Sequence, residues 1–182
     1  KNLKILNNHK NFGKGYSVFK GILESKGELV LVTDADLSTP IQEFTNLNKI
    51  LNQGYDFVIG SRSTSNSKIK IKQNPLRIFM GKSFNFLVKN LLYLKYNDTQ
   101  CGFKLFTGNT IRKIAKKCKV KSFCFDVEIL FIAKKLNLRV HELGVEWADD
   151  ARSSVSVISD SYLMIIDLIK IRFRKYNIKK FD

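Results

Sequence analysis

The sequence predicts an α/β domain with a mostly parallel central sheet flanked by helices. Segments with the apolar pattern of strands alternate along the chain with segments of helical periodicity, which is typical of βαβ units. Residues 29–32 are apolar without interruption, as in a parallel strand that is buried on both faces. The 182 residues, of which 44% are hydrophobic, are enough for one domain with a substantial core.

Strands and helices are expected in alternating order. The expected strands are residues 3–6, 29–32, 57–59, 103–106 and 139–145. The expected helices are residues 16–25, 41–53, 75–93, 109–117, 125–136 and 158–176. Residues 63–74 are polar and basic without periodicity, so we expect a mobile loop there, and residues 147–156 are also polar. The chain begins at Lys1, inside an expected strand and without a methionine, so we expect an N-terminal piece ahead of it.

Three of the expected helices carry informative patterns. The dense apolar pattern of residues 75–93 favours a core helix over a helix that contacts a membrane. The helix at residues 125–136 is expected to be amphipathic, with one apolar inner face. Residues 158–176 are apolar early and basic late, and both core packing and contact with anionic headgroups explain that pattern. No apolar run approaches the ~20 residues of a membrane-spanning helix.

The composition is strongly basic, with 32 basic and 16 acidic residues and a net charge of +16. Nucleic acid, an anionic membrane surface and phosphorylated substrates would all suit that sign. A basic nucleic-acid-binding module is therefore a rival reading, although the sequence lacks an aromatic-basic recognition motif or a zinc pattern. A non-catalytic membrane adaptor is another. The three cysteines have no metal-ligand spacing and are expected to be reduced thiols.

Two aspartates directly follow the apolar strand at residues 29–32. In extended backbone, residues i and i+2 project to the same side, so Asp34 and Asp36 are expected to converge. They would do so at the carboxyl end of the strand, where open α/β sheets bind ligands. Such carboxylates favour Mg²⁺ or Mn²⁺, which usually also hold substrate phosphates. The alternative is a helix start near Pro40, with an N-cap just before it and Glu43 within capping reach.

Two further positions suit phosphate groups. Gly13 and Lys14 lie between the first expected strand and its helix, where glycine permits close backbone approach and the helix N-terminus favours anions. An ordinary βα turn explains them equally well. Arg62 ends the third expected strand and could clamp a phosphate in a bidentate fork. A solvated surface arginine is the alternative.

Polar residues later in the chain add candidates. Residues 98–104 form a compact polar stretch before a strand, which suits a loop shaped to meet a ligand. Cys101 within it is expected to be a packed thiol, because neither His9 nor His141 is placed by sequence to activate it.

Two acidic residues and a basic segment complete the set. Asp126 and Glu128 begin a helix, where they either complement the helix dipole or position an acceptor. Arg152 and the serines after it could supply a cation and hydroxyls to phosphate, or form a flexible polar turn.

Together these stretches resemble the inverting family 2 glycosyltransferases that act on polyprenyl phosphates, in particular the branch that glucosylates dolichyl phosphate. The matching segments are NFGKG (11–15), DADLSTP (34–40), GSR (60–62), DTQCGFKLF (98–106) and FDVEIL (125–130). Trp147, followed by the basic-serine segment, also fits. The resemblance covers nearly the whole chain.

The resemblance implies a single Rossmann-like domain of the nucleotide-diphospho-sugar transferase (GT-A) type over residues 1–182, without the first strand of the family. It implies transfer of a hexose, in the first place glucose, from a UDP-sugar to polyprenyl or dolichyl phosphate, and no nucleic-acid partner. The alternative within the same fold is an enzyme with another sugar or a non-lipid acceptor.

The resemblance also assigns roles to residues and a place to the enzyme. Metal binding, by Mg²⁺ or Mn²⁺, is implied for Asp34 and Asp36. Donor binding is implied for Gly13, Lys14, Asp34 and Asp36, and acceptor binding for Arg62, Gln100, Glu128 and Arg152. The implied catalytic residues are Asp36, Arg62 and Asp126, the last in a positioning role because a phosphate monoester, with a second pKa of about 6, is already ionised.

The implied place is the cytoplasmic face of a membrane, with peripheral contact through a membrane-interface helix at residues 158–176. The residues of the DADLSTP segment and the compact chain favour the bacterial inner membrane, with the endoplasmic reticulum as the alternative.

Overall fold

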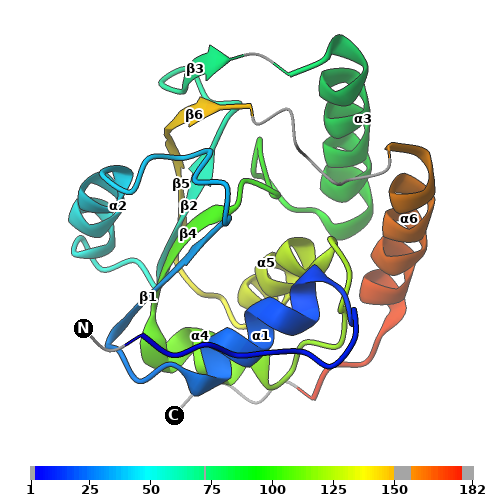
Figure 1. The fold of residues 1–182 in the computed structure, drawn as a ribbon. Helices are drawn as coiled ribbons and strands as arrows, with labels where there is room; N and C mark the ends of the chain where they lie inside the picture. The colour runs from blue at the N-terminus through cyan, green and yellow to red at the C-terminus, as the bar shows by residue number, and fades with distance from the viewer. Residues whose placement is uncertain (1–2, 72, 150–156, 178–182) are drawn as a thin grey trace.

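The computed structural model describes residues 3–71, 73–149 and 157–177 (Figure 1). Its helices are α1 (Lys14–Glu24), α2 (Glu43–Leu51), α3 (Pro75–Leu92), α4 (Gly108–Ala115), α5 (Phe125–Lys135) and α6 (Val157–Phe173). Its strands are β1 (Leu29–Thr33), β2 (Phe57–Ser61), β3 (Lys68–Ile71), β4 (Phe103–Thr107), β5 (Val140–Gly144) and β6 (Glu146–Ala148). Every expected helix is present close to its expected bounds.

The central sheet has four strands in the order β1-β4-β2-β5. β2 and β5 pair in parallel, whereas β4 runs antiparallel to both of its neighbours, β1 and β2. β1, β2 and β5 therefore point in the same direction, as expected, and β4 points against them. The chain leaves β2 at one edge of the sheet and, after β3 and α3, re-enters at that same edge, which reverses β4. The ends of β1 and β2 and the start of β4 consequently lie together.

Helices cover both faces of this sheet (Figure 1). The smaller core cluster joins the sheet to α2 through residues such as Leu47 and Val58. The larger cluster contains residues of α1, α3, α4, α5 and α6. α5 lies inside it, and all residues from Phe125 to Ala133 are buried. The expectation of an amphipathic α5 is therefore wrong, because α1, α4 and α6 surround the helix.

α3 differs from the core helix that its pattern favours. Phe84, Val88 and Leu92 are buried, but Phe79 and Phe86 are 68% and 66% exposed. Only one side of the helix packs against the domain, and α6 is its helical neighbour there. No helix within the described parts of the chain combines the length and the apolar character that crossing a bilayer requires.

Two expectations about the periphery are wrong. Residues 3–6 form no strand: Leu3 and Ile5 are exposed, and the segment runs beside α1 through polar contacts such as the Lys4–Glu24 ion pair. No strand among the described residues is paired with this segment.

The segment at residues 63–74 is not simply a loop. It contains β3, which pairs in parallel with β6 in a second, two-stranded sheet, with Ile69 opposite Trp147. The alternation Lys-Ile-Lys-Ile in β3 is itself a strand pattern, which the high density of charge concealed. Arg152 and the rest of its basic-serine segment lie outside the described residues.

Candidate active site

Residues from three elements meet at the edge where β1 and β2 end and β4 begins. Asp34 follows β1, Arg62 follows β2, and residues 98–102 lead into β4. This is the edge at which a ligand site is expected in an open α/β sheet. The structure therefore brings together three of the stretches that the sequence singled out separately, those at Asp34, at Arg62 and at residues 98–102.

The two aspartates do not lie on extended backbone. The amide of Leu37 donates to the carbonyl oxygen of Asp34 over 3.2 Å, and Leu37 has a φ of 53°, so residues 34–37 form a turn. The argument that Asp34 and Asp36 converge as residues i and i+2 of a strand is therefore wrong. The exposed Asp36 instead accepts a hydrogen bond of 3.0 Å from the amide of Ser38.

The capping alternative also fails in its detail. α2 begins at Glu43, and Gln42 occupies the N-cap position without a side-chain hydrogen bond, so neither Ser38 nor Thr39 caps the helix. The carboxylate of Glu43 accepts a hydrogen bond from the amide of Glu146 instead. It thereby ties α2 to β6.

Asp34 is paired with the first residue of α1. Nζ of Lys14 lies 2.6 Å from Oδ1 of Asp34, and both side chains are about one-third exposed. Gly13 precedes Lys14 with a φ of 95°, and a methyl group at Gly13 would lie 2.3 Å from the carbonyl oxygen of Lys121. The glycine is thus needed for contact with the protein's own backbone, while Lys14 faces the site.

Asp34 and Asp36 have the chemistry of a divalent-cation site. Their carboxylate oxygens are the ligands that Mg²⁺ and Mn²⁺ prefer, and such ions need only one or two carboxylates when substrate phosphates complete the coordination. No group of three or more His, Cys, Asp or Glu side chains suited to a metal occurs in the part of the chain that the structure describes. Two carboxylates alone fit an ion whose other ligands come from a phosphate.

Three hydrogen bonds join Arg62 to Asp98. Nε and Nη2 of Arg62 donate to the two carboxylate oxygens of Asp98 over 2.6 and 3.0 Å, and the amide of Arg62 donates to the same group. The bidentate guanidinium fork of Arg62, which was expected to hold a phosphate, is thus already occupied by the carboxylate of Asp98. Glu142 of β5 fixes the loop further by accepting from the amide of Asp98.

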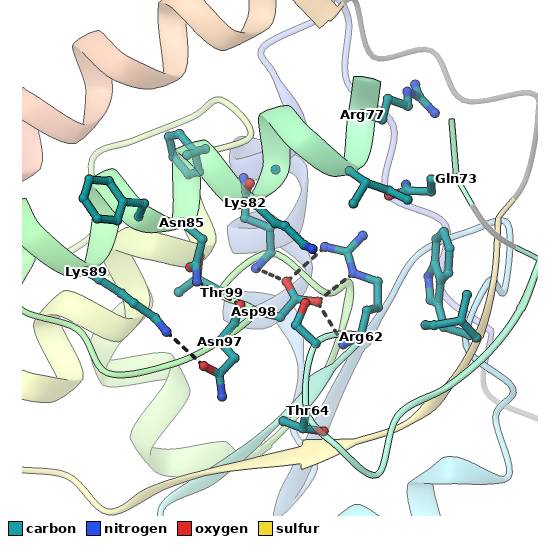
Figure 2. A pocket seen from close by; sticks show the side chains of 18 residues that line it. Arg62, Thr64, Gln73, Arg77, Lys82, Asn85, Lys89, Asn97, Asp98 and Thr99 are labelled. Atoms are coloured by element: carbon teal, nitrogen blue, oxygen red, sulfur yellow. Dashed lines mark hydrogen bonds and ion pairs between the residues drawn. The ribbon is translucent and has the colours of Figure 1, made fainter. Parts of the chain in front are cut away.

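A cavity of about 660 Å³ opens beside this pair (Figure 2). Arg62 and Asp98 lie on its sheet side, and Arg77 and Lys82 extend from α3 on the other side. Gln100 also lines it. Its apolar lining comes from Ile69, Ile78, Phe84, Phe86 and Trp147. Arg62 also stacks on the Trp147 ring, with 5.4 Å between the guanidinium carbon and the ring centroid. Asp34 and Asp36 are not among its lining residues, so the cavity is a second compartment beside them.

Asp126 lies beneath the site rather than on its surface. Its side chain is 5% exposed, and Oδ1 is 2.7 Å from Nζ of Lys104, which is 1% exposed. Burial raises the pKa of Asp126, and the charge of Asp34 acts in the same direction, while Lys104 and Lys14 oppose the shift. Asp126 is therefore an electrostatic neighbour of Asp34.

Glu128 is buried and does not line the cavity, so the role in acceptor binding expected of it is wrong. Its side chain is fully buried, and Oε2 accepts hydrogen bonds from the amides of Lys119 and Val120. Oε1 accepts from Arg174 and from the hydroxyl of Tyr176. With every acceptor position used inside the domain, Glu128 is a structural anchor.

All three thiols are buried, which confirms the expectation for Cys101. Burial, reinforced by the charge of Asp98, raises the pKa of Cys101 to about 11. A thiol with that pKa is a poor nucleophile near neutral pH.

Sequence reasoning missed several residues of the site. Asp98 opens the DTQCGFKLF segment and could have been found there as the acidic partner of an arginine. Lys104, in the same segment, is a lysine inside an apolar strand pattern, which is itself unusual. Arg77 and Lys82 gave no signal, because they are ordinary basic residues on a helix until α3 is seen beside Arg62.

Known proteins resemble this chain in sequence. A dolichyl-phosphate beta-glucosyltransferase of Dictyostelium discoideum is 38% identical over 178 residues, which cover 95% of this chain and 54% of the relative. The human dolichyl-phosphate beta-glucosyltransferase is 32% identical over 178 residues, with 94% and 55% covered. The chain spans about half the length of the curated relatives that it matches.

The fold is also known from solved structures. Glucosyl-3-phosphoglycerate synthase of Mycobacterium tuberculosis superposes with a TM-score of 0.63 at 15% identity, over 88% of this chain and 55% of that chain. This likeness confirms the expected GT-A type of fold. The family model for glycosyl transferase family 2 matches residues 1–114. This match covers more than half of the chain, and the chain therefore belongs to glycosyl transferase family 2.

Proposed function

We propose that this chain is the catalytic domain of an inverting glucosyltransferase that moves glucose from UDP-glucose to dolichyl or another polyprenyl phosphate. The names of the curated relatives support the reaction. The observation that carries the proposal is the cavity beside Arg62, which combines basic groups with apolar walls. A phosphate on a long hydrocarbon chain requires that combination.

The donor is assigned to the compartment of Asp34, Asp36 and Lys14. The synthase that shares the fold has been crystallised with Mn²⁺ and UDP-glucose, which supports a divalent ion, Mg²⁺ or Mn²⁺, on Asp34 and Asp36. When bound, that ion would neutralise charge on the departing diphosphate. Lys14, next to Asp34 at the helix N-terminus, adds a positive charge on the same side.

The acceptor phosphate is assigned to Arg62 and Gln100, with Arg77 and Lys82 across the cavity. Arg62 would contribute its positive charge rather than a bidentate fork, because Asp98 already accepts from its Nε and Nη2. One phosphate oxygen forms a bond to the anomeric carbon while the bond from that carbon to the diphosphate breaks, so UDP leaves and the configuration inverts. Because the acceptor is already ionised near neutral pH, no side chain has to remove a proton. Asp126, buried beneath Asp34, acts through positioning.

One alternative has an observation behind it. The synthase of the same fold has been crystallised with phosphoglyceric acid, which is a small soluble phosphate. An enzyme of this type would need the basic groups of the cavity but not its apolar lining residues, such as Ile69 and Trp147. The apolar lining therefore favours a lipid acceptor.

Contact with a membrane follows from the acceptor. Exposed apolar side chains on α3 and α6 provide the surface, Phe79 and Phe86 on the first and Tyr162, Ile169 and Phe173 on the second. We assign the enzyme to the cytoplasmic face of a membrane. The relatives from Dictyostelium and human are eukaryotic proteins. They support the endoplasmic reticulum as the membrane, in place of the bacterial inner membrane that was expected from the sequence.

The proposal is tested by glucose transfer from UDP-glucose to polyprenyl phosphate in the presence of Mn²⁺. Asp36→Ala should reduce the rate about a hundredfold or more, because it removes an oxygen ligand of the ion. Glu28→Ala is the matched control, since Glu28 is an exposed carboxylate at the opposite end of β1. Its rate should equal that of the wild type.

The assay also separates the alternatives. Transfer to a soluble phosphate but not to polyprenyl phosphate would favour the synthase-like acceptor. An unchanged rate in a folded Asp36→Ala variant would reject the role of Asp36.

A further inference from the structure

One lysine lies in the middle of the sheet, where apolar side chains are the rule. Lys104 belongs to β4, and its neighbours are Val32 on β1 and Ile59 on β2. Its side chain is 1% exposed. Phe106, two residues further along, belongs to the core cluster that contains α5. Residues i and i+2 of a strand share a face, so Lys104 projects toward α5.

The ammonium group of Lys104 has partners in two different elements. Nζ is 2.7 Å from Oδ1 of Asp126, in the first turn of α5. It also donates a hydrogen bond of 2.5 Å to the carbonyl oxygen of Cys101. The ion pair thereby connects α5 to the backbone of the loop that leads into β4.

That loop sets the position of two groups of the candidate active site. A methyl group at Gly102, next to Cys101, would lie 1.9 Å from Oδ2 of Asp34, so the loop is the wall against which this carboxylate rests. At its other end, Asp98 holds Arg62. A displacement of the loop backbone would move the donor side and the acceptor side together.

Stability alone does not account for a buried pair of this kind. Both groups lose their hydration, and replacing such a pair by apolar side chains of similar shape is often neutral or stabilising. We propose that Lys104 is a positioning residue, whose ion pair with Asp126 fixes the loop so that Asp34 and Arg62 face one substrate site. This inference rests on the proposed function, because it assigns the donor and the acceptor to those two groups.

The test removes both charges from the full chain, as Lys104→Met with Asp126→Leu, because a single change would leave one buried charge unpaired. We expect kcat/KM for UDP-glucose to fall about 10- to 100-fold, as for other residues that orient the ligands of a site. The affinity for UDP in the presence of Mn²⁺, measured by calorimetry, should fall as well. The melting temperature should stay close to that of the wild type.

Gly102→Ala is a second variant that leaves the ion pair intact. The added methyl group would displace Asp34, so it should weaken UDP binding in the same way. A folded Gly102→Ala variant with wild-type affinity would overturn the role of the loop as the wall for Asp34.

Lys134→Met is the matched control. Lys134 also donates to backbone carbonyls, those of Leu92 and Tyr93, but it does not line the cavity. Its loss should leave UDP affinity and kcat/KM unchanged. A double variant that binds UDP and turns over like the wild type, whatever its melting temperature, would overturn the positioning role of Lys104. A wild-type chain that binds no UDP would instead refute the proposed function, and this inference with it.

Discussion

Opposing effects act on the carboxylate of Asp98. Burial would raise its pKa, but the charge of Arg62 and the hydrogen bonds from Arg62 hold the pKa below its ordinary value. Burial would likewise lower the pKa of Arg62, and Asp98 raises it instead. Each group thus stays charged because of the other. The sheet side of the cavity depends on this pair.

Replacing Asp98 with Asn should destabilise the domain by about 3 kcal/mol near neutral pH, because Arg62 loses its counter-charge. The folded-state pKa of Asp98 is lowered, so its contribution to stability is present above its ordinary value of 3.8. That contribution is lost as the pH falls through the folded value. Urea unfolding over a pH series should show a constant difference between wild type and variant above about pH 5, shrinking below about pH 4.

Glu24→Gln serves as the control for this pH series. The pKa of Glu24 is lowered too, first by its hydrogen bond from Lys4, but the pair is solvent-exposed and screened. Its removal should change stability little at any pH. A difference for Asp98→Asn that persists undiminished at low pH would contradict the assigned ionisation of Asp98.

Single residues also mark the limit of what the sequence predicts. Asp34 and Arg62 lie at one sheet edge, as expected, because strand ends are readable from apolar runs. The orientation of Asp36 was not predictable, since it depends on a turn in which Leu37 adopts a left-handed φ. That conformation is rare for leucine and leaves no pattern in the sequence. The surroundings of Glu128 likewise include Arg174 and Tyr176, just beyond α6, which are distant in sequence.

At the scale of elements, polar contacts attach α6 and the residues just beyond it to α5 and to the segment before α5. The hydroxyl of Tyr176, just beyond α6, donates to Glu128 over 2.7 Å, and Arg174 donates to the same oxygen over 3.1 Å. Near the middle of α6, Asp167 accepts from Ser122. Polar contacts therefore hold one side of α6, while Tyr162 on the helix is 66% exposed.

Tyr176→Phe should weaken this attachment by about 1.5 kcal/mol, because a hydrogen bond to a buried carboxylate is lost. Hydrogen exchange should become faster in α6 and stay unchanged in β4, since the sheet does not depend on the contact. Tyr162→Phe, at an exposed position of α6, is the control and should leave both unchanged. Equal exchange of α6 in wild type and Tyr176→Phe would argue against the attachment.

The elements were predictable to different degrees. The bounds of helices such as α3 and α5 were found closely, although the single inner face expected of α5 was wrong because this helix is buried on all sides. Pairing was harder: the direction of β4 depends on where the chain returns to the sheet, and β3 exists because β6 lies beside it. For residues 3–6 a strand was expected but does not form, since an apolar run forms a strand only where a partner strand is present.

The whole molecule combines a net charge of +16 with an apolar surface on two neighbouring helices. α3 and α6 lie side by side at one side of the domain (Figure 1). Leu76, Phe79 and Phe86 are exposed on α3, and Ile169 and Phe173 on α6. Large exposed apolar side chains on adjacent helices are typical of an interaction surface, and a basic protein is attracted to anionic lipid.

We therefore expect the chain to bind vesicles that contain phosphatidylserine, and to bind them less at high salt. Phe79→Ser with Phe86→Ser should weaken vesicle binding about tenfold or more, because two large side chains no longer enter the bilayer interface. Sedimentation with vesicles measures the effect. The same double variant should keep its affinity for UDP, since UDP is assigned to Asp34, Asp36 and Lys14, none of which lines the cavity to which Phe86 contributes.

Leu23→Ser is the matched control, because Leu23 is an exposed apolar residue on α1, away from α3 and α6. It should bind vesicles like the wild type. Charge alone predicts a different pattern: equal binding of all three proteins to vesicles, and comparable binding to duplex DNA at moderate salt. That pattern would contradict a membrane-binding surface on α3 and α6 and would favour the nucleic-acid-binding alternative. Loss of vesicle binding in the Phe79/Phe86 variant alone requires the apolar face itself to enter the lipid.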